Sequence, residues 1–408
     1  MEPNELTIDE PNRWRLETPG CAGWEHTARP GDPNKYLMIS VDCHANEPRG
    51  FLAERLDKKF RERMPRVVVD EKGVKFTVTD SGDKSRLLMN RELEGEDRIR
   101  AKSGYTPEDR LRDHAQDGVE AEIIFPNKGL LVWATQDGEF ATAQCRAYND
   151  WAWETFGAYN DRMSPMAAIA PADLDGAIAE IKRVAKLGFR GIALPCKPIY
   201  GAHDPKHPNY NLPVFDPMWA VIQDADLPIT YHISTGRDPR AARKDGGAVI
   251  NYVSHSLSPT IEPIANMCAS GVLERFPRLR FAAIECGIGW VPWALQAMDE
   301  AYHKHHMWVH PKLKMLPSDY FKRHGAVSFQ EDPVGLDLAV KYGLVDNFMW
   351  ANDYPHHEGS WPHSAQAIER QMGRLTDEQR AKILGLNAAR VFKFDPAALR
   401  KPAGATLH

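Results

Sequence analysis

The sequence lacks the features of a secreted or membrane protein. Its six cysteines form no Cys-x-x-Cys pair, which favours reduced thiols over a disulfide framework or a thiolate zinc site. No uninterrupted apolar run approaches the roughly 18 residues that cross a bilayer. The acidic first residues also lack the charged-then-apolar pattern of a signal peptide. We therefore expect a cytosolic, cytoplasmic protein that does not contact a membrane.

A basic surplus is also missing. The chain has 51 Lys and Arg against 56 Asp and Glu, a formal net charge of −5, so it has little with which to neutralise phosphates. Nucleic acid is therefore not an expected partner. Internal repeats and low-complexity segments are absent as well. What is present is a 408-residue chain with 43% apolar residues, ordinary for a large globular core, and 16 histidines, several in strand-like surroundings.

Eight short apolar runs recur along the chain, with helix-like sequence between most of them. They lie at residues 37–44, 121–127, 163–170, 191–197, 228–233, 279–286, 326–331 and 348–353. Near-continuous apolar runs are typical of parallel strands buried on both faces, which need helical crossovers. The pattern predicts an α/β fold, a (β/α)8 TIM-type barrel. An open doubly wound sheet is the alternative, disfavoured because no G-x-G-x-x-G follows the first run.

Three segments fall outside a minimal barrel. Residues 1–35 are interpreted as an N-terminal arm, in which Trp14 and Trp24 suggest packing against another surface, a second subunit included. Residues 45–112 form an insertion after the first strand, expected over the barrel mouth, with a β-hairpin at 66–78 that turns near Gly73. The barrel then covers residues 36–395, and 396–408 form a C-terminal tail.

Polar side chains collect at the predicted carboxyl ends of the strands, where barrels of this type carry function. The first strand ends in Asp42 and His44, the fifth in His232, the sixth in Glu285 and the eighth in Asp353. Because side chains alternate along a strand, Asp42 and His44 point to the same side. Asp42, His44, His232 and Asp353 make a set of two imidazoles and two carboxylates, which suits zinc, manganese or iron(II) better than calcium. The sequence predicts a divalent metal ion here; the alternative is a buried histidine held in one tautomer by a neighbouring carboxylate.

These motifs also carry a family resemblance. The segment VDCHANEP at 41–48, His232, the stretch 271–280 and the segment WANDYPH at 350–356 resemble the amidohydrolase-related (amidohydrolase-2) family. The resemblance covers about residues 37–395 and is nearest to the branch that includes aminocarboxymuconate semialdehyde decarboxylase-like enzymes. It implies a metal-dependent barrel enzyme with a small-molecule substrate, often a homodimer. The residues matching Asp42, His44, His232 and Asp353 would hold the ion, and Asp353 would also move a proton.

One position departs from the family pattern. The decarboxylases of this branch usually end the sixth strand in a histidine that acts on the substrate, whereas this chain has Glu285 there. Glutamate adds a negative charge where an anionic carboxylate would sit. We therefore expect a hydrolase, in which metal-activated water attacks a neutral amide, ester or related carbonyl. The alternatives are a decarboxylase of an aromatic or unsaturated acid, a site with a second metal ion, and a barrel that binds a ligand without catalysis.

Further residues complete the predicted site. Glu285 is interpreted as a base or ligand, or as a carboxylate that orients a ligand histidine. His255 lies just after the fifth strand. It is interpreted as a functional replacement for the histidine missing from the end of the sixth strand, or as a solvated or helix-capping residue. Glu47 and Arg49 contact substrate or anchor the insertion, and His356 near the mouth donates to a substrate oxygen. The predicted catalytic groups are Asp353, Glu285 and His255, and the predicted substrate-binding groups are Glu47, Arg49 and His356.

Overall fold

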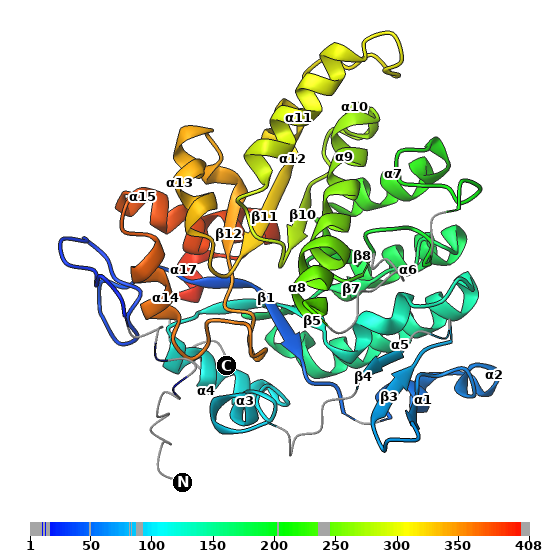
Figure 1. Cartoon of the computed structure of the whole chain (residues 1–408), viewed down its shortest axis with the longest axis horizontal. Coiled ribbons are helices and arrows are strands. Elements are labelled where there is room, and N and C mark those ends of the chain that lie inside the picture. The colour runs from blue at the N-terminus through cyan, green and yellow to red at the C-terminus, as the bar shows by residue number, and fades with distance from the viewer. Residues whose placement is uncertain are drawn as a thin grey trace.

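The structure, a computed structural model, describes residues 10, 13, 17–48, 50–80, 82, 84–86, 93–201, 204–235 and 245–400. Parallel strands follow one another in a ring in chain order (Figure 1). They are β1 (Ile39–Ala45), β5 (Ala121–Pro126), β6 (Met163–Pro165) continued by β7 (Ala167–Ala168), β8 (Ile192–Leu194), β9 (Ile229–His232), β10 (Phe281–Ile284), β11 (Gly325–Phe329) and β12 (Phe348–Trp350). A parallel bridge between Cys43 and Tyr354 joins β1 to the segment after β12. The predicted barrel and its eight strands are confirmed.

The burial of the strands explains their apolar sequences. Every residue of β1, β5, β9 and β10 is buried, so both faces of each strand exclude water. One face of the ring fills its interior, and the other packs against the surrounding helices. Burial of apolar surface on both sides contributes roughly 25 cal/mol per Å². Alternation of apolar and polar residues is therefore lost, except at the strand ends that carry the site.

Helices follow the strands and form the outer layer (Figure 1). The first of these are α5 (Gly138–Phe156), α6 (Leu174–Leu187), α7 (Asp216–Ala225), α8 (Gly247–Ile250), α9 (Ile261–Ala269) and α10 (Val272–Arg275). They are followed by α11 (Val291–Lys304), α12 (Pro317–His324), α13 (Pro333–Lys341), α14 (Ser364–Gln371), α15 (Asp377–Ala381), α16 (Asn387–Phe392) and α17 (Pro396–Leu399). In α6, Asp173 accepts a capping hydrogen bond from the Gly176 backbone N–H, and Gly188 ends the helix at φ +105°. No described helix has the length and apolar character needed to cross a bilayer.

The insertion after β1 contains α1 (Phe51–Arg55), α2 (Lys58–Arg61), β2 (Arg66–Val69), β3 (Lys75–Val78), β4 (Lys84–Arg86), α3 (Gly95–Arg100) and α4 (Pro107–Asp117). The predicted hairpin is confirmed as β2 and β3, which turn at Gly73 with φ +76°, and β4 adds a third strand. Arg100 donates to the carbonyls of His356 (3.0 Å) and Gly359 (3.1 Å). The insertion therefore contacts the loop after β12 at the mouth of the barrel.

The described part of the N-terminal arm packs on its own chain. The Arg380 guanidinium lies 3.8 Å from the centre of the Trp24 ring, and Arg29 pairs with Glu369 at 2.7 Å. Trp24 therefore has a partner within this subunit, while Trp14 lies outside the described residues. All six cysteines are free, as expected.

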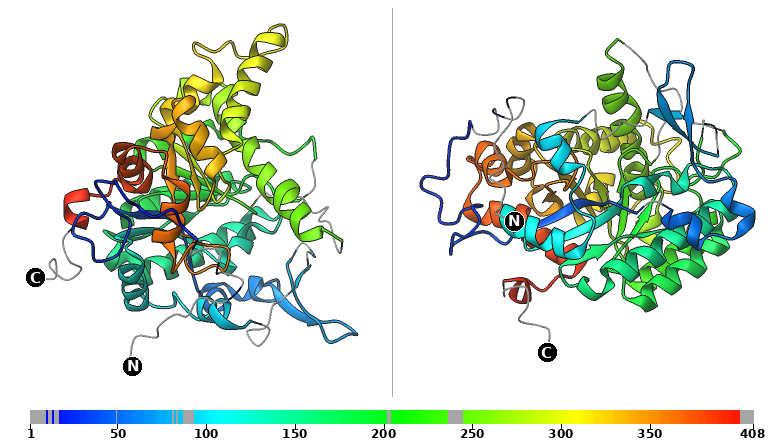
Figure 2. Two further views of the ribbon diagram at one scale, coloured as in Figure 1. Left: turned by 60° about the vertical axis from the view of Figure 1, so that its left-hand side comes forward. Right: turned by 90° about the horizontal axis from the view of Figure 1, so that it is seen from below.

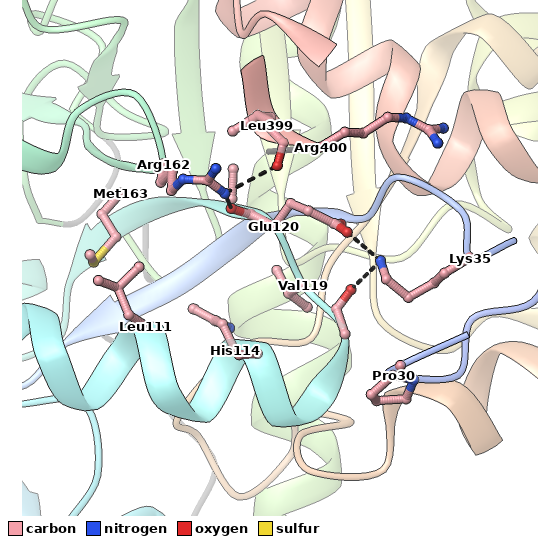
Figure 3. A pocket seen from close by; sticks show the side chains of 14 residues that line it. Pro30, Lys35, Leu111, His114, Val119, Glu120, Arg162, Met163, Leu399 and Arg400 are labelled. Carbon is pink, nitrogen blue, oxygen red and sulfur yellow. Dashed lines mark hydrogen bonds and ion pairs between the residues drawn. The ribbon is translucent and has the colours of Figure 1, made fainter. Parts of the chain in front are cut away.

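A cavity of about 280 Å³ lies at the amino-terminal ends of β5 and β6 (Figure 3). Lys35 donates to the Gly118 carbonyl at 2.8 Å and pairs with Glu120, and Arg162 donates to the Leu399 carbonyl at 3.2 Å. These bonds tie α17 and the arm to the barrel. In TIM-type barrels this end serves stability and the opposite end serves catalysis.

Candidate metal centre

Five acidic and imidazole side chains converge at the carboxyl end of the barrel. Asp42 and His44 come from β1, His232 ends β9, Glu285 follows β10, and Asp353 follows β12. His232 Nε2 lies 3.3 Å from both Asp42 Oδ1 and Glu285 Oε2. His44 Nε2 lies 3.5 Å from both Asp42 Oδ1 and Asp353 Oδ1, and 4.0 Å from Glu285 Oε2. We call these five residues the metal cluster; they include all four predicted ligands.

Both histidines of the cluster are held in the tautomer that a metal ligand requires. His44 Nδ1 lies 3.0 Å from the Pro126 carbonyl, and His232 Nδ1 lies 2.9 Å from the Ile233 carbonyl. Because a carbonyl oxygen only accepts, each Nδ1 carries the proton and donates it. Each Nε2 then keeps a free lone pair directed into the cluster. Such a bond to the second ring nitrogen is the usual support of a ligating histidine.

Several polar atoms of the cluster have no hydrogen-bond partner among the described residues. Among the described residues, nothing hydrogen-bonds His44 Nε2, Asp42 Oδ2 or either carboxylate oxygen of Asp353, although these side chains are fully buried. Buried polar atoms are nearly always hydrogen-bonded, because leaving one unpaired is costly. A single cation placed among these atoms would interact with the imidazole lone pair and with the carboxylate oxygens at the same time. The residues present thus fit a divalent ion with nitrogen and oxygen ligands.

The carboxylates crowd one another in the absence of such an ion. Burial raises the pKa of Asp353 well above its usual range, and the charge of Asp42 raises it further. Burial and the charges of Asp353 and Asp42 raise the pKa of Glu285 in the same way. Burial lowers the pKa of His44 to about 3, so this ring stays neutral. A divalent cation would relieve the repulsion between the three carboxylates.

Two residues of the cluster have unusual backbone conformations. Glu285 has φ 59° and Asp353 has φ 54°, in the left-handed region that non-glycine residues seldom adopt. Each costs of order 1 kcal/mol and persists only where the surroundings impose it. The Glu285 N–H donates to Ser328 Oγ at 2.9 Å, and the Asp353 carbonyl accepts from the His356 N–H at 2.8 Å. Strain of this kind at the ends of two strands, β10 and β12, points to a functional requirement for these side-chain directions.

His356 lies beside the cluster, and its side chain is 23% exposed. Its ring stacks on that of His44 with centroids 4.0 Å apart, and its Nδ1 lies 3.4 Å from Asp353 Oδ1. Burial is the largest of the effects that lower its pKa to about 4. His356 thus lies beside the fully buried Asp353 with part of its own side chain exposed, and its contact with a substrate remains a prediction.

The other predicted substrate contacts have different surroundings. Glu47 is buried and accepts a hydrogen bond from the Asn127 N–H at 2.9 Å, which anchors the loop after β5. Arg49 lies outside the described residues. Substrate binding by either residue stays a prediction.

His255 lies in a π-helical segment, Asn251–Leu257, after β9. It is half-buried, and no group of potential metal ligands among the described residues includes it. π-Helical turns are rare and often lie at functional sites. Tyr252, on the same segment, has its pKa raised by burial and by the nearby charges of Glu285 and Glu358. The catalytic role of His255 stays a prediction.

Two residues were not predicted from the sequence: Glu358, whose carboxylate lies beside the cluster, and Tyr252, whose pKa is affected by the charge of Glu285. The Glu358 carboxylate groups with those of Glu285 and Asp353. A signal for Glu358 was present, because it lies five positions after Asp353 in the same loop. No pattern marked Tyr252, which lies in the π-helical segment and is 48% exposed.

A second buried set of polar residues supports the strands beneath the metal cluster. Arg110 pairs with both oxygens of Glu122 and donates to the His44 carbonyl at 2.8 Å. Asn352 accepts from Ser40 Oγ at 2.8 Å and donates to Asp117 Oδ2 at 3.0 Å. We call Ser40, Arg110, Asp117, Glu122 and Asn352 the support cluster. It fixes β1 and the end of β12, which carry three of the predicted ligands.

Comparison with known proteins agrees with this architecture. The gamma-resorcylate decarboxylase of Rhodococcus jostii (strain RHA1) is 26% identical over 311 residues, 70% of this chain and 87% of that protein. A solved amidohydrolase from Mycobacterium avium subsp. paratuberculosis K-10 matches with a TM-score of 0.72 and 19% identity, over 88% of this chain and 98% of that one. The dihydroxybenzoic acid decarboxylase of Polaromonas sp. JS666, solved with manganese and 2-nitroresorcinol, matches with a TM-score of 0.60 and 18% identity, over 88% and 97% of the two chains.

The family is shown by a separate match. The family model described as Amidohydrolase covers residues 41–394, from β1 to the helices after β12. All five residues of the metal cluster lie within this range. The candidate site therefore lies in an enzyme fold of the amidohydrolase superfamily. The chain is a member of the amidohydrolase family.

Proposed function

We propose that the protein is a metal-dependent decarboxylase, which removes carbon dioxide from an aromatic or unsaturated carboxylic acid without a redox step. The observation that carries the proposal is the metal cluster, whose unpaired donors lie in a chain with gamma-resorcylate decarboxylases among its relatives. A decarboxylase is thus the first candidate, in place of the hydrolase that the sequence favoured. We further propose that the protein is a homodimer, as the resemblance implied, and that it is cytoplasmic, as the sequence without a signal-peptide pattern suggested.

Asp42, His44, His232 and Asp353 would hold the ion. When bound, a divalent ion such as manganese supplies a positive charge that holds the acid and stabilises the negative charge developing in the reaction. The two Nε2 lone pairs and the two carboxylates provide donors without any rearrangement of the histidine tautomers. The arrangement is therefore pre-organised for binding.

Asp353 is suited to move the proton. Decarboxylation breaks the bond between a carbon of the substrate and its carboxylate, and a proton takes the place of the departing carbon dioxide. Asp353 has two oxygens without a described hydrogen-bond partner, so one oxygen would bind the ion while the other carries the proton. Its carboxyl group would give the proton to that carbon. His356 Nδ1, 3.4 Å away and partly exposed, would return a proton from solvent.

Glu285 is proposed as a further ligand of the ion. The ligand atoms of Asp42, His44, His232 and Glu285 all lie within 4.8 Å of one another. A carboxylate that coordinates the ion has part of its charge neutralised, so it repels a substrate carboxylate less than a free one. Glu285→Gln should therefore weaken manganese binding, whereas Glu285→His should restore much of it. Equal affinity in all three proteins, measured by calorimetry, would exclude this role.

A hydrolase is the second candidate, and Glu285 is the observation that favours it. Its negative charge remains adjacent to the site and disfavours an anionic substrate more than a neutral amide or ester. In that reaction Asp353 would take a proton from the attacking water and pass it to the leaving group. The two candidates share the metal cluster and differ in the substrate charge that they accept.

The two candidates are separated by one assay on metal-loaded protein. Carbon dioxide release is measured across hydroxybenzoic acids, in parallel with hydrolysis of activated esters and amides, and Asp353→Asn serves as the control. Release of carbon dioxide that requires both the ion and Asp353 is expected. Hydrolysis that requires both, without carbon dioxide release from any acid, would instead support the second candidate.

A further inference from the structure

Strand β2 presents an unusual free edge. It is an outer strand of the three-stranded sheet β2-β3-β4, and all four of its residues are exposed. Val67 is 57% exposed, Val68 37% and Val69 54%. The hairpin projects away from the barrel in both views of Figure 2. An apolar edge strand invites pairing with another chain, and proteins usually protect such edges with proline, charge or a cover.

The register of the hairpin determines which backbone groups face outward. The Asp70 N–H donates to the Val74 carbonyl at 2.9 Å, so this pair is hydrogen-bonded. Hydrogen-bonded and non-hydrogen-bonded pairs alternate along an antiparallel ladder. Val68 opposite Phe76 is therefore the next hydrogen-bonded pair, and Val67 and Val69 direct their N–H and C=O groups away from β3. No described residue outside the hairpin hydrogen-bonds these groups.

We propose that β2 pairs in antiparallel fashion with β2 of a second copy of this chain, about a two-fold axis through Val68. Val67 then lies opposite the partner's Val69, and Val69 opposite the partner's Val67. Both pairs have outward-facing backbone groups, so each can exchange two hydrogen bonds. The two small sheets join into one continuous six-stranded sheet across an isologous interface.

The side chains match in the same register. Arg66 lies opposite the partner's Asp70, and the symmetry repeats this pair on the other side of the axis. Arg66 and Asp70 are both exposed, and no described residue donates to Asp70 Oδ2, because the turn N–H groups of Lys72 and Val74 use Oδ1. Opposite charges placed directly across two strands stabilise their pairing. The sequence Arg-Val-Val-Val-Asp at 66–70 is thus complementary to itself when reversed.

Other registers fit less well. An axis through Val67 places Val69 opposite the partner's Pro65, which has no N–H to donate. An axis through Val69 places Val67 opposite the partner's Glu71, where the chain already turns. Of these three axes, only the one through Val68 pairs outward-facing backbone groups and also places opposite charges across from each other.

Disulfide trapping tests the position of the axis. At Val68 the two copies meet as a non-hydrogen-bonded pair, with Cα atoms about 4.5 Å apart, within the range of a disulfide. Val68→Cys should therefore form a covalent dimer under mild oxidation. Val67→Cys is the matched control, because its own counterpart lies diagonally across the axis at about 7–8 Å. A Cys21→Ser background removes the one native thiol that is not buried. Equal cross-linking of the two variants, or none of Val68→Cys, overturns the proposal.

A reversible test uses sedimentation of the uncrosslinked protein. Val67→Pro removes an outward N–H from each copy and leaves the β2–β3 bonds intact, whereas Val67→Thr keeps the N–H. We expect the dimer dissociation constant of Val67→Pro to exceed that of Val67→Thr about tenfold or more. Arg66→Glu should weaken the dimer, while Arg66→Lys should preserve it. Turnover per site by the metal-loaded variants checks folding. A monomeric wild type, or equal dissociation constants for the proline and threonine variants, overturns the proposal.

Discussion

The metal cluster and the support cluster are equally buried, yet they differ in whether their polar atoms are hydrogen-bonded by described residues. Asp42, His44 and Asp353 contain buried atoms that no described residue satisfies. One layer below, both oxygens of Glu122 are taken by Arg110, and Asn352 is bonded on both its amide atoms. Because burial is the same, the difference lies in what completes each set. The support cluster is complete within the chain, and the metal cluster requires a group from outside.

One carboxyl group of each cluster, Asp353 and Glu122, shows how the surroundings alter the effect of burial. Burial raises the pKa of Asp353, and the opposing charge of Arg100 does not outweigh this effect. Burial would also raise the pKa of Glu122, but the charges of Arg110 and His114 outweigh it and hold this pKa far below its usual range. Glu122 therefore stays ionised and pairs with Arg110, whereas Asp353 is the group for which we propose proton exchange.

The largest predicted effect is on the metal cluster. Asp353→Asn keeps the size of the side chain but cannot transfer a proton, so turnover should fall by about 10²–10⁴-fold. The unfolding free energy of the metal-free protein should stay the same or rise, because one buried acid is removed from a crowded group. Steady-state kinetics and urea unfolding measure the two quantities. Turnover within a few-fold of wild type would contradict the role of Asp353.

The next effect is on the support cluster, and it should appear in stability. Glu122→Gln leaves the fully buried Arg110 guanidinium without its anion, which should cost about 3–5 kcal/mol of unfolding free energy. Asp109→Asn is the matched control, because the Asp109–Arg112 pair is exposed and should contribute less than about 1 kcal/mol. Equal unfolding free energies for the two variants in urea would show that the support cluster does not hold the fold.

A smaller effect should separate the clusters by pH. Since the folded-state pKa of Glu122 is depressed, its contribution is fully present above the unfolded-state pKa of about 4.3 and is lost as the pH falls below it. The stability gap between wild type and Glu122→Gln should therefore narrow by about 1.4 kcal/mol per pH unit below about pH 4. Unfolding titrations across this range measure the gap. A gap that stays constant or widens in acid would contradict the ion pair.

The metal cluster was largely predictable from the sequence, because parallel strands place their carboxyl ends together. Asp42 and His44 share a face by strand alternation, and His232 and Asp353 end other strands of the same barrel. The structure brings all four together with Glu285. The reaction class was harder to predict from the sequence than the site. The charge of Glu285 suggested a hydrolase, whereas relatives of the chain are decarboxylases.

The support cluster could not be predicted, because its bonds join distant parts of the chain. Asn352 bonds Ser40 and Asp117, which lie 312 and 235 positions away. No local periodicity marks such partners, and a buried arginine such as Arg110 has the sequence signature of a surface residue. The left-handed conformation of Glu285 was equally hidden, since it depends on the strand end and its neighbour Ser328.

Calorimetric titration of metal-free protein with manganese tests the central claim most directly. Asp42 contributes a buried oxygen with no partner in the chain, so its amide variant removes a ligand charge without changing size. We expect the wild type to bind a single ion per chain and Asp42→Asn to bind it at least about tenfold more weakly. A wild type that binds no ion, or equal affinity in the two proteins, would contradict the assignment of this cluster as the metal centre.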